Sequence, residues 1–126
     1  MSQFRSDSVA KAGEIRKAAT IELFSGVISD TPIDTGRLRA NWQATTVNPA
    51  TGQLDAIDKN GSGTVALMTN VVNASQDEQT LWLTNNLPYA LGIEYGYSSQ
   101  APTGMVRRNM ARVAANIKKH ANRNKV

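Results

Sequence analysis

The residues with the most evident chemical potential are Asp34-Thr35-Gly36, the triplet that carries the acid/base pair of aspartic proteases. In a dimer of half-size subunits, two such aspartates share one proton. Those enzymes hold the triplet between apolar residues, whereas Arg37-Leu38-Arg39 follows here at once. Asp-x-Gly is also ordinary helix-cap and turn chemistry. The flanking residues favour the cap or turn, and a dimeric aspartic protease stays a remote alternative.

Other arrangements that could hold a metal or a phosphate are incomplete. Asp58-Lys59-Asn60-Gly61 resembles part of a calcium loop, but its first and twelfth positions would be Ala56 and Leu67, which offer no carboxylate. Gly61-Ser62-Gly63 lacks the Lys-Ser/Thr of a phosphate loop. The single histidine, His120, and the absence of cysteine leave no His-based or thiolate site. We expect no enzyme activity, no metal and no cofactor.

Three tyrosines and one acid stand together in residues 85–97, a stretch rich in turn residues. Tyr89, Tyr95 and Tyr97 could stack on nucleic-acid bases. A core or a subunit interface is favoured, because tyrosine suits a surface with one apolar and one wet side. Glu94 is either the partner of a basic residue on a neighbouring subunit or a plain surface acid. The stretch therefore predicts a shaped contact surface.

Charge is distributed unevenly along the chain. The net charge is +4, yet seven cations and no acid follow Glu94, so the part up to Glu94 sums to −3. A basic tail on a slightly acidic body predicts a polyanion or an acidic protein surface as partner, and a solvated helix face is the alternative. No apolar run approaches the ~20 residues that span a bilayer, and no signal peptide is evident, so we expect a soluble protein made in a cytoplasm.

Hydrophobic periodicity predicts the elements that would position these residues. A length of 126 residues suits one domain, residues 1–126. The predicted order is a helix over 6–29, a helical turn over 36–40, a strand over 42–47, a polar loop at about 48–63, a short helix over 65–72, a strand over 79–84, the contact stretch, and a helix from 103 that frays after 121, with a basic end at about 118–126. This is an α+β fold, a small antiparallel sheet packed by a long N-terminal and a C-terminal helix.

Each long helix carries an apolar stripe that we expect to be buried. The first stripe is Ala12, Ile15, Ala19, Leu23 and Val27, widened by Ile21, Phe24 and Ile28. The last helix repeats apolar residues at Val106, Met110, Val113, Ile117 and Ala121.

Two segments together resemble one known family. Residues 31–42, Thr-Pro-Ile-Asp-Thr-Gly-Arg-Leu-Arg-Ala-Asn-Trp, are similar to a "TPxDTGxLRxxW" segment of the neck and tail-completion family of long-tailed bacteriophages. Residues 83–107, with Asn-Asn-Leu-Pro-Tyr-Ala, Glu-Tyr-Gly and Gln-Ala-Pro-Thr-Gly-Met-Val-Arg, are similar to that family's second segment. The resemblance covers residues 3 to about 120, and residues 48–75 match nothing known.

The resemblance implies a structural virion protein, located at the head–tail junction, that acts by ring assembly around the DNA channel. A ring of six is expected, with twelve as the alternative. Its partners would be copies of itself, other neck, connector and tail proteins, and packaged DNA contacted without sequence reading, but no membrane. A tail terminator or other tail-tube ring is the first alternative, and a free nucleic-acid-binding protein is the second.

Two sets of residues are expected to make these contacts. The first set, for the subunit or partner interface, is Arg37, Arg39, Tyr89, Glu94, Tyr95, Tyr97 and Gln100, with the two arginines as charge partners for Glu94. The second set, for a basic surface that faces DNA or a partner, is Arg107, Arg108 and Arg112.

Overall fold

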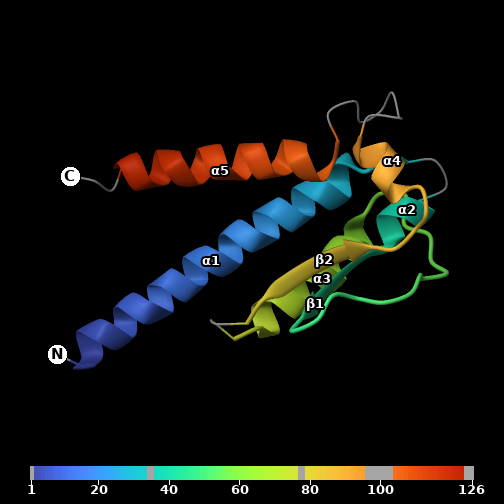
Figure 1. Ribbon diagram of the computed structural model, residues 1–126. Coiled ribbons are helices and arrows are strands. Elements are labelled where there is room, and N and C mark those ends of the chain that lie inside the picture. The colour runs from blue at the N-terminus through green and yellow to red at the C-terminus, as the bar shows by residue number, and fades with distance from the viewer. Residues whose placement is uncertain (1, 34–35, 77–78, 96–103, 124–126) are drawn as a thin grey trace.

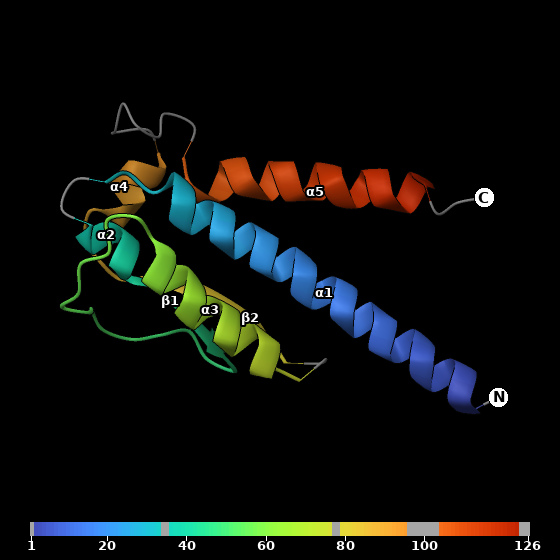
Figure 2. The ribbon, with the colours of Figure 1, turned by 180° about the vertical axis from the view of Figure 1, so that it is seen from behind.

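A two-stranded sheet and a long helix at each end of the chain define the architecture. The computed structural model describes residues 2–33, 36–76, 79–95 and 104–123. In chain order the elements are α1 (Ser2–Asp30), α2 (Arg37–Ala40), β1 (Trp42–Thr46), α3 (Ser62–Ala74), β2 (Leu81–Asn85), α4 (Ala90–Glu94) and α5 (Val106–Arg123). The helix α3 and part of α1 lie along the sheet, while α5 lies beside the end of α1 (Figures 1 and 2). The α+β prediction is confirmed.

The predicted elements are present, with shifted ends and one addition. The first helix begins at Ser2 instead of residue 6 and stops at Asp30, just before Pro32, as expected. The short helix over 65–72 is confirmed within the longer α3. The helix α4 was not predicted, because Gly92 and the turn residues before it masked one helical turn in the contact stretch.

The two strands pair antiparallel, and only one face of their sheet meets the core. Trp42 lies opposite Asn85, Ala44 opposite Leu83, and Thr46 opposite Leu81. Ala44, Leu81 and Leu83 pack against the buried cluster, so this face is the inner one. On the outer face Trp82 lies opposite Thr45 and donates its indole N–H to the carbonyl of Val47 at 3.2 Å.

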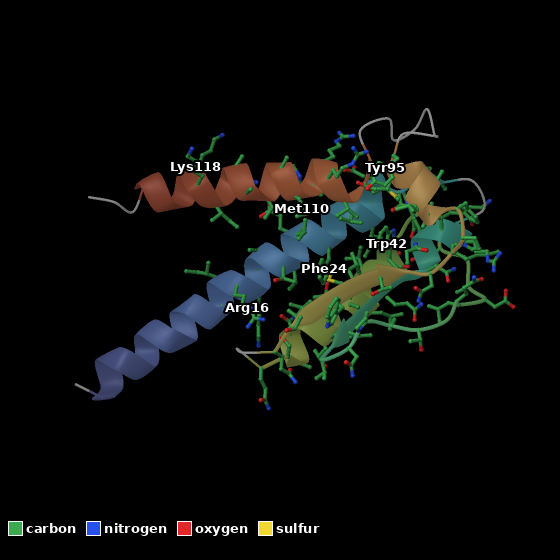
Figure 3. All side chains as sticks on the ribbon, viewed as in Figure 1. Arg16, Phe24, Trp42, Tyr95, Met110 and Lys118 are labelled. Carbon is green, nitrogen blue, oxygen red and sulfur yellow. The ribbon has the colours of Figure 1, made fainter. Side chains whose placement is uncertain are left out.

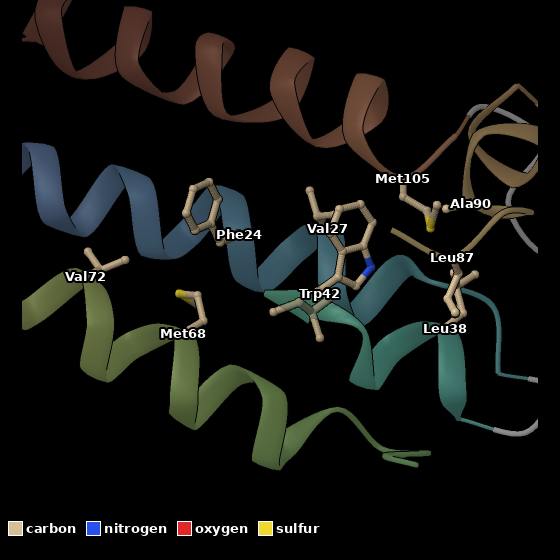
Figure 4. Packing of buried hydrophobic residues seen from close by; sticks show 10 residues of the cluster. Phe24, Val27, Leu38, Trp42, Met68, Val72, Leu87, Ala90 and Met105 are labelled. Carbon is tan, nitrogen blue, oxygen red and sulfur yellow. The ribbon is translucent and has the colours of Figure 1, made fainter. Parts of the chain in front are cut away.

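The core lies between α1, α3 and the inner face of the sheet, and it continues under α2 and α4 (Figure 4). Its buried members are Phe24, Val27, Ile28, Leu38, Trp42, Met68, Val72, Leu87, Ala90 and Met105. Residues from both ends of the chain thus share one cluster.

The apolar stripes of the long helices are buried only in part. Phe24, Val27, Ile28 and Val113 are buried, as predicted. Ile15, Met110 and Ile117 are exposed, which corrects the expectation for these three. For Ile15 and Ile117 the reason is the angle between the helices: α1 and α5 separate toward the N and C termini in both views, so neither covers the other there (Figures 1 and 2). Met110 is exposed although its neighbour Asn109 is buried against α1.

Candidate assembly surface

The segment from Thr31 to Trp42 joins the end of α1 to the sheet. The Thr31 hydroxyl donates to the carbonyl of Val27 at 2.7 Å and accepts the indole N–H of Trp42 at 2.8 Å. The Arg39 guanidinium donates to the carbonyl oxygens of Thr31, Lys59 and Ser29 at 3.0, 2.6 and 2.7 Å. Arg39 is buried. These side chains form a frame that links α1, α2 and the loop before α3.

This burial corrects the expectation that Arg39 offers its charge to Glu94 of a neighbouring subunit. All three hydrogen bonds of its guanidinium end on carbonyl oxygens of its own chain. Arg37, in contrast, is exposed, and its Nη2 donates to Gln53 Oε1 at 3.3 Å. Of the two arginines, Arg37 is the one whose position suits a surface role.

Two buried or half-buried asparagines fix the polar loop that precedes α3. Asn41 exchanges hydrogen bonds with the backbone of Leu54, with its Oδ1 2.7 Å from the nitrogen and its Nδ2 3.1 Å from the oxygen. Asn86 donates to the carbonyl oxygens of Ala50 and Gly52, both at 2.9 Å. The loop is therefore held against the segments that carry both family-like motifs.

Asp58 at the end of this loop caps α3. Its Oδ2 accepts the N–H and the hydroxyl of Thr64, both at 2.7 Å, and its Oδ1 accepts the N–H of Gly61 at 3.2 Å. The bonds from Thr64 lower the pKa of Asp58; burial opposes them, while Gly61 and the Arg39 charge add to the lowering. The calcium-like sequence is thus a helix cap.

Glu94 caps α5 in the same way, from a different element. Its Oε1 accepts the N–H groups of Met105 and Val106 at 2.7 Å, and its Oε2 accepts the N–H of Arg107 at 3.0 Å. The Arg107 Nε lies 3.0 Å from the same Oε2. Burial alone raises the pKa of Glu94, but these four donors outweigh it and hold that pKa below its usual value. The carboxylate is therefore engaged within its own subunit, which differs from the expected pairing with a neighbour.

The outward side of α4 carries an apolar and aromatic patch. Pro88, Leu91 and Tyr95 recur at spacings of three and four, and all three are exposed, Leu91 at 67% and Tyr95 at 61%. The Arg107 guanidinium lies 4.8 Å from the centroid of the Tyr95 ring, which orders that ring by a cation–π contact (Figure 3). Tyr89 is also exposed, on another side of the turn. We call Pro88, Leu91 and Tyr95 the α4 patch.

Each arginine of the expected basic surface has an acidic partner in the chain. Arg107 pairs with Glu94, Arg108 Nε lies 3.8 Å from Asp30, and Arg112 Nη1 lies 3.7 Å from Glu22. All three side chains are about half exposed, so they remain accessible. Their charge is locally balanced, which weakens the prediction of a bare polyanion-binding face on this part of α5.

Sequence reasoning missed the polar seam that joins α1 to α5. Asn109 is buried and donates to Asp30 Oδ2 at 2.9 Å and to the carbonyl of Met105 at 2.7 Å, while its Oδ1 accepts from Arg112. A Cβ at Gly26 would overlap the Asn109 Oδ1, so the glycine permits this crossing. An open hollow of about 490 Å³ lies along the seam, lined by Glu22, Ser25, Gly26, Ser29, Asp30, Arg108, Asn109 and Arg112.

Some of the expected site residues cannot be placed. Asp34, Tyr97 and Gln100 lie outside the described residues. Within the part of the chain that the structure describes, no three His, Asp or Glu side chains are grouped as metal ligands would be. Among those same residues, no helix combines the length and apolarity needed to cross a bilayer.

The chain matches no protein-family model, no curated protein and no solved structure.

Proposed function

We propose that the chain is a structural subunit of the head–tail neck of a long-tailed bacteriophage, which assembles with copies of itself and binds neighbouring neck and tail proteins. The support begins with the two family-like sequence segments, residues 31–42 and 83–107. The first segment supplies the internal frame around Thr31, Arg39 and Trp42. The second segment supplies the exposed α4 patch.

The α4 patch is the observation that carries the proposal. Leu91 and Tyr95 are large, exposed apolar side chains on a helix whose position is fixed. Leu87 and Ala90 anchor this helix in the core, and Glu94 bonds it to α5. Aromatic and apolar side chains on a rigid support are typical of the anchors of protein interfaces. Such a surface binds a partner through complementary shape, which is how the subunits of a particle recognise one another.

The test is to replace these anchors in the phage that encodes the chain. With Leu91→Asp or Tyr95→Ala, we expect heads and tails that form but stay unjoined, counted by electron microscopy. Leu67→Asp is the matched control, because Leu67 is equally exposed on α3, away from the patch. Mass spectrometry of purified particles should find the chain in the wild type. Normal joining by both patch variants, or particles without the chain, would refute the proposal.

A further inference from the structure

Asn60 is the one asparagine of the sequence that is followed by a glycine. The amide of an asparagine side chain can be attacked by the main-chain nitrogen of the next residue, and a glycine leaves that approach open because it has no Cβ. The attack closes a five-membered succinimide ring, which water opens to aspartate or isoaspartate. Asn60 is exposed, so water reaches it. The pair Asn60-Gly61 is therefore a candidate site of modification.

The side chain of Asn60 is folded back along the residues that follow it. Its Oδ1 accepts the N–H of Ser62 at 3.0 Å and the hydroxyl of Ser62 at 2.8 Å. This turn encloses the peptide between Asn60 and Gly61, whose nitrogen would make the attack. The two donors polarise the side-chain carbonyl, and they are placed to stabilise the negative charge that Oδ1 gains when its carbon is attacked.

A carboxylate lies beside the attacking nitrogen. Asp58 Oδ1 accepts the N–H of Gly61 at 3.2 Å, while the Oδ2 of the same carboxylate is held by Thr64. A base within hydrogen-bond reach of the proton that must leave is the geometric requirement of general base catalysis. The bonds from Thr64 lower the pKa of Asp58, so this carboxylate is ionised at neutral pH and can accept a proton.

We propose that Asn60 is a site of self-modification in the folded chain, converted through a succinimide to aspartate and isoaspartate. The nitrogen of Gly61 forms a bond to Asn60 Cγ while its proton passes to Asp58. The bond between Cγ and Nδ2 then breaks, and the amide leaves as ammonia with that proton. Water adds to one of the two ring carbonyls, which gives aspartate or isoaspartate. The inference does not depend on the proposed function, because water is the only other reactant.

The conversion alters a loop that the fold uses. The carbonyl of Lys59 accepts a hydrogen bond from Arg39 at 2.6 Å, and the N–H of Asp58 donates to the carbonyl of Gly36 at 3.0 Å. Isoaspartate adds one carbon to the main chain directly after Lys59, so it displaces the residues that make these bonds. The modification therefore loosens the frame around Arg39.

Incubation of the purified full chain in warm neutral buffer, followed by peptide mass spectrometry, tests the inference. We expect the peptide that contains Asn60 to exchange amide for acid severalfold faster than the peptides that contain Asn70 and Asn73. These two asparagines are exposed on α3 and precede valine and alanine, so they report the rate at which other exposed asparagines convert. An isoaspartate assay on the same samples should detect the second product of ring opening.

Two variants separate the part of the fold from the part of the sequence. Ser62→Ala removes one donor from Asn60 Oδ1 and should slow the conversion severalfold in the folded chain, with little effect in the chain unfolded by urea. Ser29→Ala, which removes an exposed hydroxyl from α1, is the matched control and should leave the rate unchanged. An Asn60 that stays intact while Asn70 and Asn73 convert would overturn the inference. So would a Ser62→Ala rate equal to that of the wild type in the folded chain.

Discussion

The carboxylate of Glu94 satisfies backbone N–H groups that α5 leaves without helical partners. The first turn of α5 contains no acid of its own, so the charge that balances the helix dipole comes from α4. Gly104 makes this approach possible: its φ is +83°, and a Cβ there would lie 2.6 Å from Glu94 Oε2. One residue thus fixes the position of α5 relative to the α4 patch.

Replacing Glu94 by Gln should lower the free energy of unfolding by about 1–2 kcal/mol at neutral pH, the range for loss of a helix cap and a charged hydrogen bond. The folded-state pKa of Glu94 lies below the usual 4.5, so its contribution is present above that pH and is lost as the pH falls through the folded value. Urea unfolding measured from pH 7 to pH 2.5 should therefore show the wild-type and Gln curves converging in acid.

Asp55→Asn is the control, because Asp55 is an exposed acid in the loop. It should leave stability nearly unchanged at every pH. Residual acid sensitivity in the Glu94→Gln variant is expected from Asp58, whose pKa is also lowered. If wild type and variant differed by the same amount at pH 7 and at pH 2.5, the charge of Glu94 would have no part in the cap.

At the scale of elements, the crossing of α1 and α5 depends on the missing side chain of Gly26. Gly26→Ala would place a methyl group on Asn109 and Arg112 and push the helices apart. We expect a loss of about 1–3 kcal/mol from overpacking, partly offset by the ~1 kcal/mol that alanine gains over glycine in a helix. Urea unfolding measures the net change.

The same substitution in α3 provides the comparison. At Gly63 a Cβ would lie 3.4 Å from Asp58 Oδ2, an ordinary contact. Gly63→Ala should therefore leave stability unchanged or raise it by less than about 1 kcal/mol. If both alanine variants were stabilised alike, the close approach of Asn109 to α1 would be wrong.

The elements themselves could be predicted because their signals are local. The periodic apolar residues of α1, the stop at Pro32 and the short apolar strands all act within a few neighbours. The burial of Arg39 could not be predicted in this way, because its partners are carbonyl oxygens, which leave no trace in residue type. The exposure of Ile15 depends on the angle between two helices far apart in the chain.

For the candidate surface, the sequence indicated the stretch but not how its residues are bonded. The stretch around Tyr95 is predicted to be a contact surface, and the exposed ring of Tyr95 suits that role. For Glu94 the sequence suggested a basic partner on a neighbouring subunit or a plain surface acid, and neither anticipated its cap of α5, because the N–H donors that it binds lie 11 to 13 residues away. The sequence did contain one signal for this cap: a glycine, Gly104, precedes a helix whose first turn has no acid, so an acid from another element can approach it.

At the scale of the whole molecule, α5 carries its basic residues in two groups, one with acidic partners at its start and one without them toward its end. The arginines at its start each face an acid, whereas Lys118 (labelled in Figure 3) and Lys119 are exposed and have no ion pair among the side chains that the structure describes, those of residues 13–33, 36–76, 79–95 and 104–119. Phosphate or an acidic partner would therefore bind Lys118 and Lys119 without displacing a carboxylate of the described side chains. The DNA affinity that these two unpaired lysines give an isolated chain distinguishes a subunit that works by assembly from a free nucleic-acid-binding protein.

Fluorescence anisotropy with a labelled DNA duplex across a salt series tests this separation. We expect weak, salt-sensitive binding by the isolated chain, and Lys118→Gln with Lys119→Gln should reduce the slope of log K against log salt by about two, close to one unit for each lost phosphate contact. Arg108→Gln with Arg112→Gln should reduce it less, because contact of these arginines with phosphate must displace Asp30 and Glu22. A larger effect of the arginine pair would show that the ion pairs do not shield them. Tight binding by the lone chain at physiological salt would favour the nucleic-acid-binding alternative, because a subunit that works by assembly gains its DNA contacts from many copies around one channel.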